Sequence, residues 1–295
     1  MTETEDHAVR LEIGPDSFAR LTFDQPGSRA NTLSTTVWEQ LAAACAELLP
    51  RTDLRGLIVQ SAKPGIFIAG ADLRELAALP AENSEPTRAL LRLGHGVLDA
   101  LERLPFPTVA LIDGACLGGG LEVALACDFR LAGSNPKVKL GLPEVKLGLI
   151  PGWGGTQRLP RLIGVAIATP LVCTGDVLTA ERAKEFSLVH DVVPSERLPA
   201  AAIDFLSAER SASTWSDLRW HKHTPVPDDQ SLPDVSPTIA ALPDDDRTAA
   251  QAAWQVMFLG TALPLPEALV LETEAFIPLI ASPAARGKID AFLKR

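Results

Sequence analysis

The chain contains few cysteines, and none of them lies in a metal-binding or redox pattern. No CxxC pair or histidine pair accompanies the four, which are widely spaced in apolar or small-residue runs: Cys45, Cys116, Cys127 and Cys173. Free cysteine behaves as a small hydrophobic residue, and disulfides belong to oxidising compartments. The sequence therefore predicts buried, unpaired thiols in a reducing compartment and no bound metal.

Basic residues are scarce relative to acidic ones. The sequence has 27 lysines and arginines against 37 aspartates and glutamates, a formal net charge of −10. A field of this sign repels phosphate groups, so we expect no non-specific binding to nucleic acid or to an anionic membrane. A phosphorylated ligand would need a local group of basic side chains.

Long apolar runs are absent as well. The best candidate for a membrane span is interrupted by Asp113 and Glu122, and the first six residues are acidic or polar, without an apolar signal region. We therefore expect a cytoplasmic protein. With 295 residues, 46% of them hydrophobic, the chain is long enough to bury a large core in one large domain or two smaller ones.

The stretch from Pro107 to Asp128 is the most informative part of the chain. It predicts a buried strand over 108–112, a glycine turn over 114–120 and a short apolar helix that carries one carboxylate, Glu122. Glycines let a backbone approach a ligand closely, and the start of a helix leaves N–H groups unpaired. The combination predicts a site for a developing negative charge.

Two further stretches have related features. Residues 65–73 run from apolar strand residues through a small-residue turn into an aspartate-led helix, so two turns offer free amides for one oxygen atom. Downstream, Glu144 precedes the glycine-rich run 148–158. Structural explanations are open for each feature, because an acid near a helix start complements the helix dipole and a glycine run is commonly a plain turn.

Strand and helix patterns alternate along most of the chain. Alternating residues at 8–13 and 18–23 predict a hairpin, and a capping box that begins at Thr36 predicts the start of a helix. Strands are expected at 56–60, 108–112, from 129 and at 189–193, and helices at 86–104, 179–186 and 195–208. This rhythm predicts an α/β core.

The composition changes after residue 210. Prolines and aspartates crowd the range 224–246, which favours an extended, solvated linker or lid. Helical patterns follow at 247–259, 265–280 and 284–293. We therefore divide the chain into a core (1–210), a Pro/Asp-rich linker or insertion (211–247) and a C-terminal helical domain (248–295).

Taken together, the three motifs resemble those of the crotonase superfamily and, within it, the enoyl-CoA hydratases. The likeness covers residues 8–210 and returns in the last helical stretch. It is closest to the hydratase half of the multifunctional fatty-acid oxidation alpha chain, through Ala30-Asn-Thr-Leu33 and the range 138–164. The resemblance implies a ClpP-like ββα spiral core with a C-terminal helical domain.

The resemblance assigns catalytic roles to four residues. It places an oxyanion hole at the backbone N–H groups of Ala71 and Gly119, and the two catalytic glutamates at Glu122 and Glu144. The implied reaction adds water across the 2,3 double bond of a trans-2-enoyl-CoA: Glu122 helps to deprotonate the water and Glu144 delivers a proton to the α carbon. Two carboxyls beside one water in an apolar pocket cannot both ionise cheaply, so they would share a proton.

Other functions are open at this point. A Δ3,Δ2-enoyl-CoA isomerase or an acyl-CoA hydrolase is the alternative within the superfamily, although a single carboxylate would suit proton transfer without water. An interaction subunit that docks a partner through the Pro/Asp-rich segment is the alternative outside catalysis. Both glutamates being present favours the hydratase.

The resemblance also implies a coenzyme A site and no separate cofactor. The CoA part of the acyl-CoA substrate is expected along the first glycine turn and near the C-terminus, at Ala69, Ala71, Asp72, Leu73, Arg74, Arg29, Ala30, Lys294 and Arg295. No GxGxxG follows a strand, so we expect no nicotinamide. The five histidines match no family motif and are expected to be surface or packing residues.

The resemblance further implies an oligomeric state, and the chain departs from the family pattern at two positions. Relatives form trimers or dimers of trimers, so a homotrimer or hexamer is expected, while the Pro/Asp-rich segment leaves a monomer open. Trp153 stands where many relatives have a small residue, and we expect its indole to narrow or floor the acyl pocket. Ser187 stands in place of a usual glycine.

Overall fold

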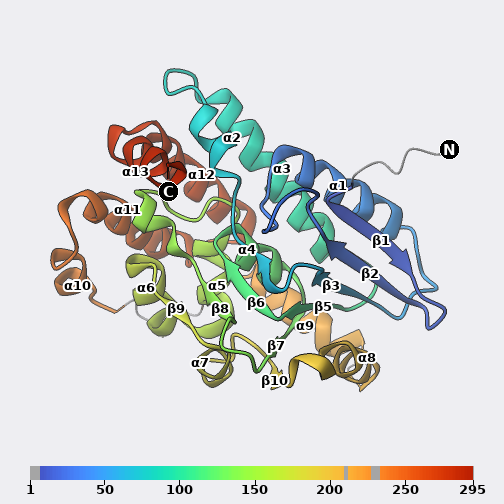
Figure 1. The fold of residues 1–295 in the computed structure, drawn as a ribbon. Helices are drawn as coiled ribbons and strands as arrows, with labels where there is room; N and C mark the ends of the chain where they lie inside the picture. The colour runs from blue at the N-terminus through green and yellow to red at the C-terminus, as the bar shows by residue number, and fades with distance from the viewer. Residues whose placement is uncertain (1–6, 209–211, 227–232, 295) are drawn as a thin grey trace.

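The chain winds through two sheets, entering each in turn (Figure 1). The structure is a computed structural model and describes residues 7–208, 212–226 and 233–294. A six-stranded sheet has the order β1-β2-β3-β5-β7-β10, and a four-stranded sheet has the order β4-β6-β8-β9. The strands are β1 (Val9–Ile13), β2 (Phe18–Phe23), β3 (Gly56–Ser61), β4 (Gly65–Ile68), β5 (Thr108–Ile112), β6 (Gly114–Leu117), β7 (Phe129–Gly133), β8 (Lys139–Gly141), β9 (Val177–Leu178) and β10 (Asp191–Val193).

Three pairs of consecutive strands generate the spiral. The first strand of each pair (β3, β5 and β7) lies in the larger sheet and the second (β4, β6 and β8) lies in the smaller one, and within each sheet they pair in parallel. Helical segments follow each pair, so the chain advances by one ββα turn at a time. The predicted α/β spiral core is confirmed.

Helices cover the spiral and continue beyond it to the C-terminus. They are α1 (Thr35–Leu48), α2 (Leu73–Ala78), α3 (Glu85–Glu102), α4 (Gly119–Ala126), α5 (Gly155–Ile163), α6 (Val165–Thr174), α7 (Ala180–Glu185), α8 (Leu198–Ala208), α9 (Ala212–His223), α10 (Ser236–Ala240), α11 (Asp244–Gly260), α12 (Leu265–Ala281) and α13 (Pro283–Leu293), with short 3-10 turns η1 (Pro143–Leu147) and η2 (Ser195–Arg197). Figure 1 shows the C-terminal helices on the side of the molecule away from β1 and β2.

Two local predictions were wrong in detail. Helix α1 begins at Thr35 with Ser34 as its N-cap, because the Ser34 hydroxyl accepts a hydrogen bond from the N–H of Val37, so the capping box does not begin at Thr36. The range 114–120 is not one turn, since 114–117 forms strand β6. A Cβ on Gly114 would come within 2.0 Å of the backbone of β4. The absence of a side chain at this position therefore lets β4 and β6 lie close together.

The C-terminal helices share the core of the spiral. Ala250, Ala253 and Met257 of α11 belong to the same buried cluster as the strands of the spiral. The Gln157 side chain of α5 donates to the carbonyl of Val256, at 3.1 Å. The helices expected at 247–259, 265–280 and 284–293 are present, while the domain boundaries themselves stay predictions.

The Pro/Asp-rich segment is only partly extended. Its central residues 227–232 lie outside the described ranges, but helix α9 comes before them and helix α10 after them. Val235 and Ile239 are buried, so the second part of the segment packs against the molecule. Most of its described side chains are exposed or partly exposed, as expected, but the expectation of an extended segment is wrong for α10, because Val235 and Ile239 pack against the molecule.

Other expectations concern the thiols and Ser187. All four cysteines are buried and unpaired, as predicted. Ser187 has a φ of +59°, in the left-handed region that favours glycine, which fits its place at a usual glycine position.

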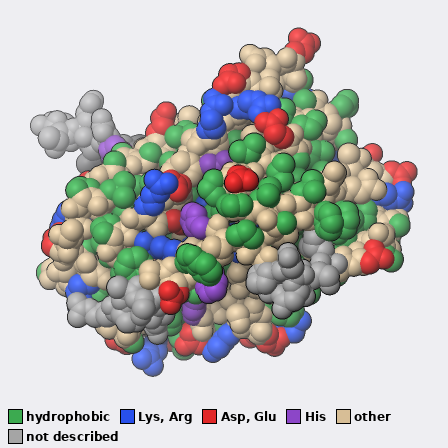
Figure 2. Space-filling model, turned by 180° about the vertical axis from the view of Figure 1, so that it is seen from behind, with side chains coloured by type: hydrophobic (Ala, Val, Ile, Leu, Met, Phe, Trp, Pro, Cys, Tyr) green, Lys and Arg blue, Asp and Glu red, His purple; other side chains and the backbone are tan. Residues whose placement is uncertain are grey.

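Within the described ranges, no single helix is long and apolar enough to cross a membrane. Helices α12 and α13 reach that length and apolar content only as a pair, with a bend of 71° between them. On the face drawn in Figure 2, acidic and basic side chains are interspersed, with hydrophobic side chains between them. That face carries no continuous basic patch of the kind that binds nucleic acid.

Candidate active site

Helix α4 places the first carboxylate next to a tight glycine turn. Gly118 has a φ of +54°, which favours glycine, and α4 begins at the next residue. A Cβ on Gly120 would lie 2.2 Å from the carbonyl oxygen of Ile68, so only glycine lets α4 pack this closely on β4. Glu122 lies in the first turn of the helix and is 1% exposed.

Two backbone amides beside this turn are unpaired. Gly119 opens α4, where the first N–H groups have no partner within the helix. Ala71 forms a parallel bridge with Leu33, and the hydrogen bonds of the bridge join Leu33 to the residues before and after Ala71. Among the described residues, neither Ala71 nor Gly119 donates its N–H to a protein group. A Cβ on Gly118 would lie 3.7 Å from Cα of Gly70, so the two turns are neighbours.

The carboxylate of Glu122 is hydrogen-bonded to the protein through one of its two oxygens. Its Oε1 accepts hydrogen bonds from the backbone N–H groups of Trp153 and Gly155, both at 2.7 Å. Its Oε2 is buried and has no hydrogen-bond partner within the described part of the chain. Because buried polar atoms are normally paired, this free oxygen marks a place for a water molecule or a ligand.

Glu144 presents a second carboxylate to the same turn. It is the second residue of η1, and a Cβ on Gly118 would lie 2.7 Å from its Oε1. Its side chain is half-buried, and its Oε2 is buried and unpaired among the described residues. The structure therefore brings both predicted glutamates to the turn that carries the Gly119 amide.

Both carboxyls favour their protonated form. Burial, followed by the charges of Glu272 and Glu144, raises the pKa of Glu122 well above its usual range, against the hydrogen bonds from Gly155 and Trp153. Burial also raises the pKa of Glu144 to about 8, and the charge of Glu272 adds to this effect. Two neighbouring carboxyls that share one proton can supply an acid and a base together.

The comparisons with known proteins agree with this geometry. The sequence pattern of the enoyl-CoA hydratase/isomerase family matches residues 14–216. The chain belongs to this family. An enoyl-CoA hydratase from Bacillus anthracis is 30% identical, with a TM-score of 0.64, over 98% of this chain and 96% of that one.

Two other solved structures extend the comparison. An enoyl-CoA hydratase from Geobacillus kaustophilus is 27% identical, with a TM-score of 0.66, over 99% of this chain and 95% of that one. Human mitochondrial Δ3,Δ2-enoyl-CoA isomerase is 24% identical over 98% of each chain, with a TM-score of 0.71, and shares the fold. The family description names both hydratases and isomerases, so membership by itself does not separate the two reactions.

The residues expected to hold CoA lie mostly on two neighbouring segments. The N–H of Ala69 donates to the carbonyl of Asn31 at 2.8 Å, and the N–H of Leu33 donates to the carbonyl of Gly70 at 2.9 Å. These bonds join the stretch that carries Arg29 and Ala30 to the stretch that carries Ala69, Ala71, Asp72, Leu73 and Arg74. Both arginines are exposed, and their contact with a CoA phosphate stays a prediction.

Asp72 and Lys294 differ from the other expected CoA-binding residues in their surroundings. Asp72 is the N-cap of α2, and its Oδ1 accepts a hydrogen bond from the N–H of Arg74 at 2.8 Å, so its side chain has a structural task. Lys294 is exposed at the end of α13, which packs on α2 through a bond from Arg286 to the carbonyl of Leu79. Arg295 lies outside the described residues.

A third buried carboxylate, Glu272 of α12, was not predicted. It is 0% exposed and accepts hydrogen bonds from the N–H of Gly154 at 2.6 Å and the N–H of Thr156 at 3.1 Å. His95 Nε2 of α3 lies 3.7 Å from its Oε1. No motif marks Glu272, but it occupies the buried face of α12 together with Ala268 and Phe276, four residues away on either side. An acid within an apolar helical stripe is the signal that the sequence offered.

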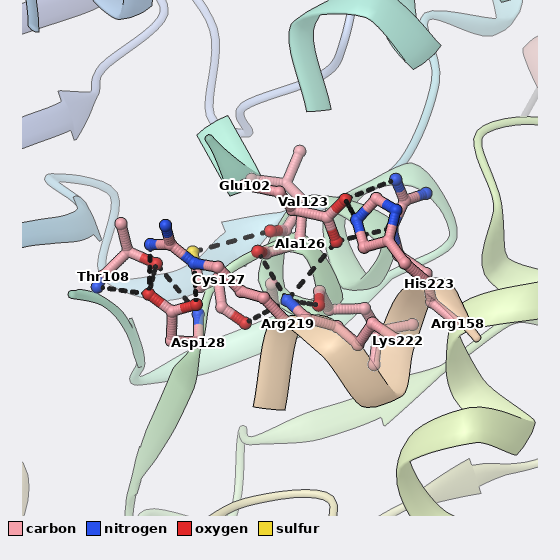
Figure 3. A network of polar contacts seen from close by, with 12 residues as sticks. Glu102, Thr108, Val123, Ala126, Cys127, Asp128, Arg158, Arg219, Lys222 and His223 are labelled. Atoms are coloured by element: carbon pink, nitrogen blue, oxygen red, sulfur yellow. Dashed lines mark hydrogen bonds and ion pairs between the residues drawn. The ribbon is translucent and has the colours of Figure 1, made fainter. Parts of the chain in front are cut away.

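A second polar network supports the far sides of α4 and α5 (Figure 3). Glu102 accepts hydrogen bonds from Arg158 at 3.0 and 3.1 Å and lies 3.3 Å from Lys222 Nζ. His223 Nε2 lies 3.1 Å from the same carboxylate. The Lys222 ammonium also donates to three carbonyls at the C-terminal end of α4, where a positive charge is favourable.

Three of the histidines have buried neighbours. His190 packs between Phe129 and Phe205, as a packing residue would, and burial lowers its pKa to about 3. His95 lies beside Glu272, and the partly exposed His223 lies beside Glu102. Their sequence context gives no sign of this, because the partner acids are far away along the chain.

Trp153 fills the space between the turn and α3. Its ring packs edge-on against Trp38, with ring centroids 4.9 Å apart. A Cβ on Gly94 would lie 2.3 Å from the indole, and a Cβ on Gly119 would lie 2.8 Å from it. The indole therefore borders the residue that offers the Gly119 amide.

Proposed function

We propose that this protein is an enoyl-CoA hydratase, which adds water across the 2,3 double bond of trans-2-enoyl-CoA thioesters to form 3-hydroxyacyl-CoA. The observation that carries the proposal is the pair of buried, unpaired oxygens, Oε2 of Glu122 and Oε2 of Glu144, beside one turn. Water addition needs two proton transfers, one from the water and one to the α carbon. Two carboxyls match that need, whereas a proton shift along an allylic system needs one.

The proposed reaction starts with the thioester carbonyl between the N–H groups of Ala71 and Gly119. These amides have no competing protein acceptor among the described residues, so they are free to hold the oxygen. Negative charge builds on this oxygen as water attacks the β carbon, and preorganised amides stabilise it. Each donor of this kind contributes on the order of 3 kcal/mol to the lowering of a barrier.

The carboxyl pair handles the protons. Within a pair that shares one proton, we assign to Glu122 the role of the base, which takes a proton from the attacking water, and to Glu144 the role of the acid, which gives its proton to the α carbon. The hydroxyl and the new C–H bond together account for one water, and the pair keeps one proton throughout. The pKa of Glu144, about 8, leaves a carboxyl that carries its proton at neutral pH.

Coenzyme A is part of the substrate in this proposal, and no separate cofactor takes part. The exposed Arg29 and Arg74 are the basic side chains best placed for its phosphates. A cytoplasmic location, a role in fatty-acid β-oxidation and assembly as a trimer or hexamer stay predictions.

The decisive experiment follows the loss of conjugated-thioester absorbance with short, medium and long 2-enoyl-CoA substrates. We expect hydration by the native protein and a loss on the order of 10³-fold in kcat for Glu122→Gln with folding intact. Glu267→Gln, an exposed acid of α12, serves as the matched control and should keep full activity.

Three outcomes would overturn the proposal. Turnover of a 3-enoyl-CoA much faster than hydration of the 2-enoyl isomer would identify an isomerase. Release of free CoA would identify an acyl-CoA hydrolase. A calorimetric titration with acyl-CoA that shows no binding would leave an interaction subunit.

A further inference from the structure

The backbone N–H groups of the turn that supports Glu122 donate to two different carboxylates. The backbone N–H groups of residues 153 and 155 donate to Glu122 Oε1, and those of residues 154 and 156 donate to Glu272. Four consecutive amides thus alternate between an acid from α4 and an acid from α12. Any movement of Glu272 would be transmitted to Glu122 through one peptide unit.

The two carboxylates share the positive end of one helix. Helix α5 begins at Gly155, and the unpaired N–H groups of a helix start favour negative charge nearby. Glu272 accepts a third hydrogen bond from the hydroxyl of Thr156 at 2.5 Å, so both of its oxygens are paired. Glu122 uses one oxygen only. Donors stabilise negative charge on a carboxylate, and Glu272 accepts three hydrogen bonds whereas Glu122 accepts two.

Among the described residues, neither nearby cationic side chain forms a hydrogen bond with Glu272. The titratable groups that face it are His95 from α3, Arg158 from α5, Glu122 from α4 and Glu144 from η1. Arg158 forms its ion pair with Glu102, although its Nη1 lies close to Gly154, whose N–H donates to Glu272. His95 Nε2 lies 3.7 Å away, beyond hydrogen-bond distance. A charge in a dry interior that is only partly balanced acts strongly on its neighbours.

We propose that Glu272 is a positioning residue of the active site: its negative charge keeps a proton on the Glu122–Glu144 pair, and its hydrogen bonds fix the turn that holds Glu122. The inference rests on the proposed hydratase function for its kinetic consequence only. The electrostatic consequence holds whatever the carboxyl pair catalyses. A carboxylate far along the chain, in the C-terminal helices, thus completes a site whose other residues lie in the spiral core.

The direction of the effect follows from charge. A neighbouring anion disfavours ionisation of an acid, so the pair retains its proton to higher pH when Glu272 is charged. In Glu272→Gln the pair should lose this proton at lower pH. The alkaline limb of the kcat/KM profile should therefore move down by roughly one pH unit, the scale on which a nearby charge shifts an acid. KM should change little, because Glu272 does not reach the substrate.

Two measurements on the full-length protein test this. The first is the pH profile of kcat/KM for a 2-enoyl-CoA in native protein, Glu272→Gln and Glu274→Gln. Glu274 lies on the same helix, is exposed, and pairs with Arg88, so its variant is the matched control and should keep the native profile. The second is an infrared titration of the protonated carboxyl band, which requires no turnover.

The outcomes separate the inference from the proposed function. A downward shift of both the kinetic limb and the carboxyl titration in Glu272→Gln, absent in Glu274→Gln, supports it. Titrations that superimpose on the native curve overturn it, even where hydration itself is observed. Absence of hydration in the native protein overturns the function and leaves the infrared result to decide the inference.

Two further variants separate the charge of Glu272 from its hydrogen bonds. Glu272→Met removes the charge and suits the apolar stripe of α12, but it leaves three donors of the turn without an acceptor, so circular dichroism must show that the variant folds. It should shift the carboxyl titration in the same direction as glutamine. Glu272→Asp keeps the charge and should leave the titration near the native value while lowering kcat, since a shorter side chain cannot hold the turn. A native kcat in Glu272→Asp would contradict the positioning role.

Discussion

Two groups of side chains that contain buried glutamates lie on either side of the Trp153 backbone, and burial has opposite results in them. Among the described residues, Glu122 and Glu144 form no ion pair with a cation, and burial raises the pKa of both. Glu102 is about as buried as Glu122, but the charges of Arg158 and Lys222 and a hydrogen bond from His223 outweigh its desolvation and hold its pKa well below the usual range. The difference lies in the neighbours, since Glu102 and Glu122 share residue type and burial.

The backbone of Trp153 joins the two groups. Its N–H donates to Glu122 at 2.7 Å, and its carbonyl accepts a hydrogen bond from Arg158 at 2.9 Å. We therefore expect the ionised group to act as a rigid support and the protonated group to carry the proposed chemistry. Substitutions in the protonated group should mainly lower activity, and substitutions in the ionised group should mainly lower stability.

The largest effect is expected for Glu144→Gln. This change removes the acid that we assign to α-carbon protonation, so kcat should fall on the order of 10³-fold or more. Folding should survive, because glutamine has nearly the same shape and needs no buried proton. Single-turnover kinetics and circular dichroism measure the two quantities. A kcat within tenfold of native would remove Glu144 from the mechanism.

The opposite pattern is expected for Glu102→Gln. The change leaves Arg158 and Lys222 buried without their counter-charge, and breaking a buried pair in this way costs about 3–5 kcal/mol of unfolding free energy. Urea denaturation measures the loss. Glu85→Gln, on the same helix α3 but in an exposed pair with Arg92, should lose less than about 1 kcal/mol. Equal losses in the two variants would contradict the support role.

The pH dependence of stability should report the protonated group. The pKa of Glu144 rises from 4.5 to about 8 on folding, so the folded protein binds this proton more tightly than the unfolded chain does. Its stabilisation is complete below pH 4.5 and is lost as the pH rises through 8. We expect the free energy of unfolding to fall by about 2 kcal/mol between pH 6 and pH 8, measured by urea denaturation. Glu144→Gln should flatten the slope, and an unchanged slope would contradict the assignment.

The smallest effect is expected for the side chain that lies between the two groups. Trp153→Leu keeps both backbone bonds and removes the indole that borders Gly119. If the indole limits the acyl pocket, the ratio of kcat/KM for long over short 2-enoyl-CoA should rise about tenfold, the size of effect that a few methylenes produce. Glu122 chemistry should continue, so the short substrate serves as the internal control. A constant ratio across the series would show that the acyl chain runs elsewhere.

Local patterns predicted much of the fold correctly. The strand at 108–112 and the hairpin of β1 and β2 follow from alternation and apolar runs, and the three C-terminal helices follow from helical spacing. The wrong predictions concern residue types that occur in two kinds of local structure. Glycine at 114 suits a turn but serves close contact between strands, and prolines near 237 suggest an open segment but alternate with apolar residues that become buried.

The two glutamates of the proposed site stand out in the sequence for a similar reason. Each stands alone in an apolar or glycine-rich stretch, and the family resemblance supplied the order of the motifs. Glu272, Glu102 and their basic neighbours were not predictable as partners, because ordinary acids and bases occur throughout the chain and nothing local says which ones meet.

The sequence by itself determined the ββα rhythm, the glycine-led turns and the identity of two acids suited to the same chemistry, since these depend on local backbone preferences and side-chain type. Only the tertiary structure decided which carboxyls hold protons and which are ionised. That outcome depends on burial and on charges brought close from distant parts of the chain, such as Glu272 from α12 and Lys222 from α9.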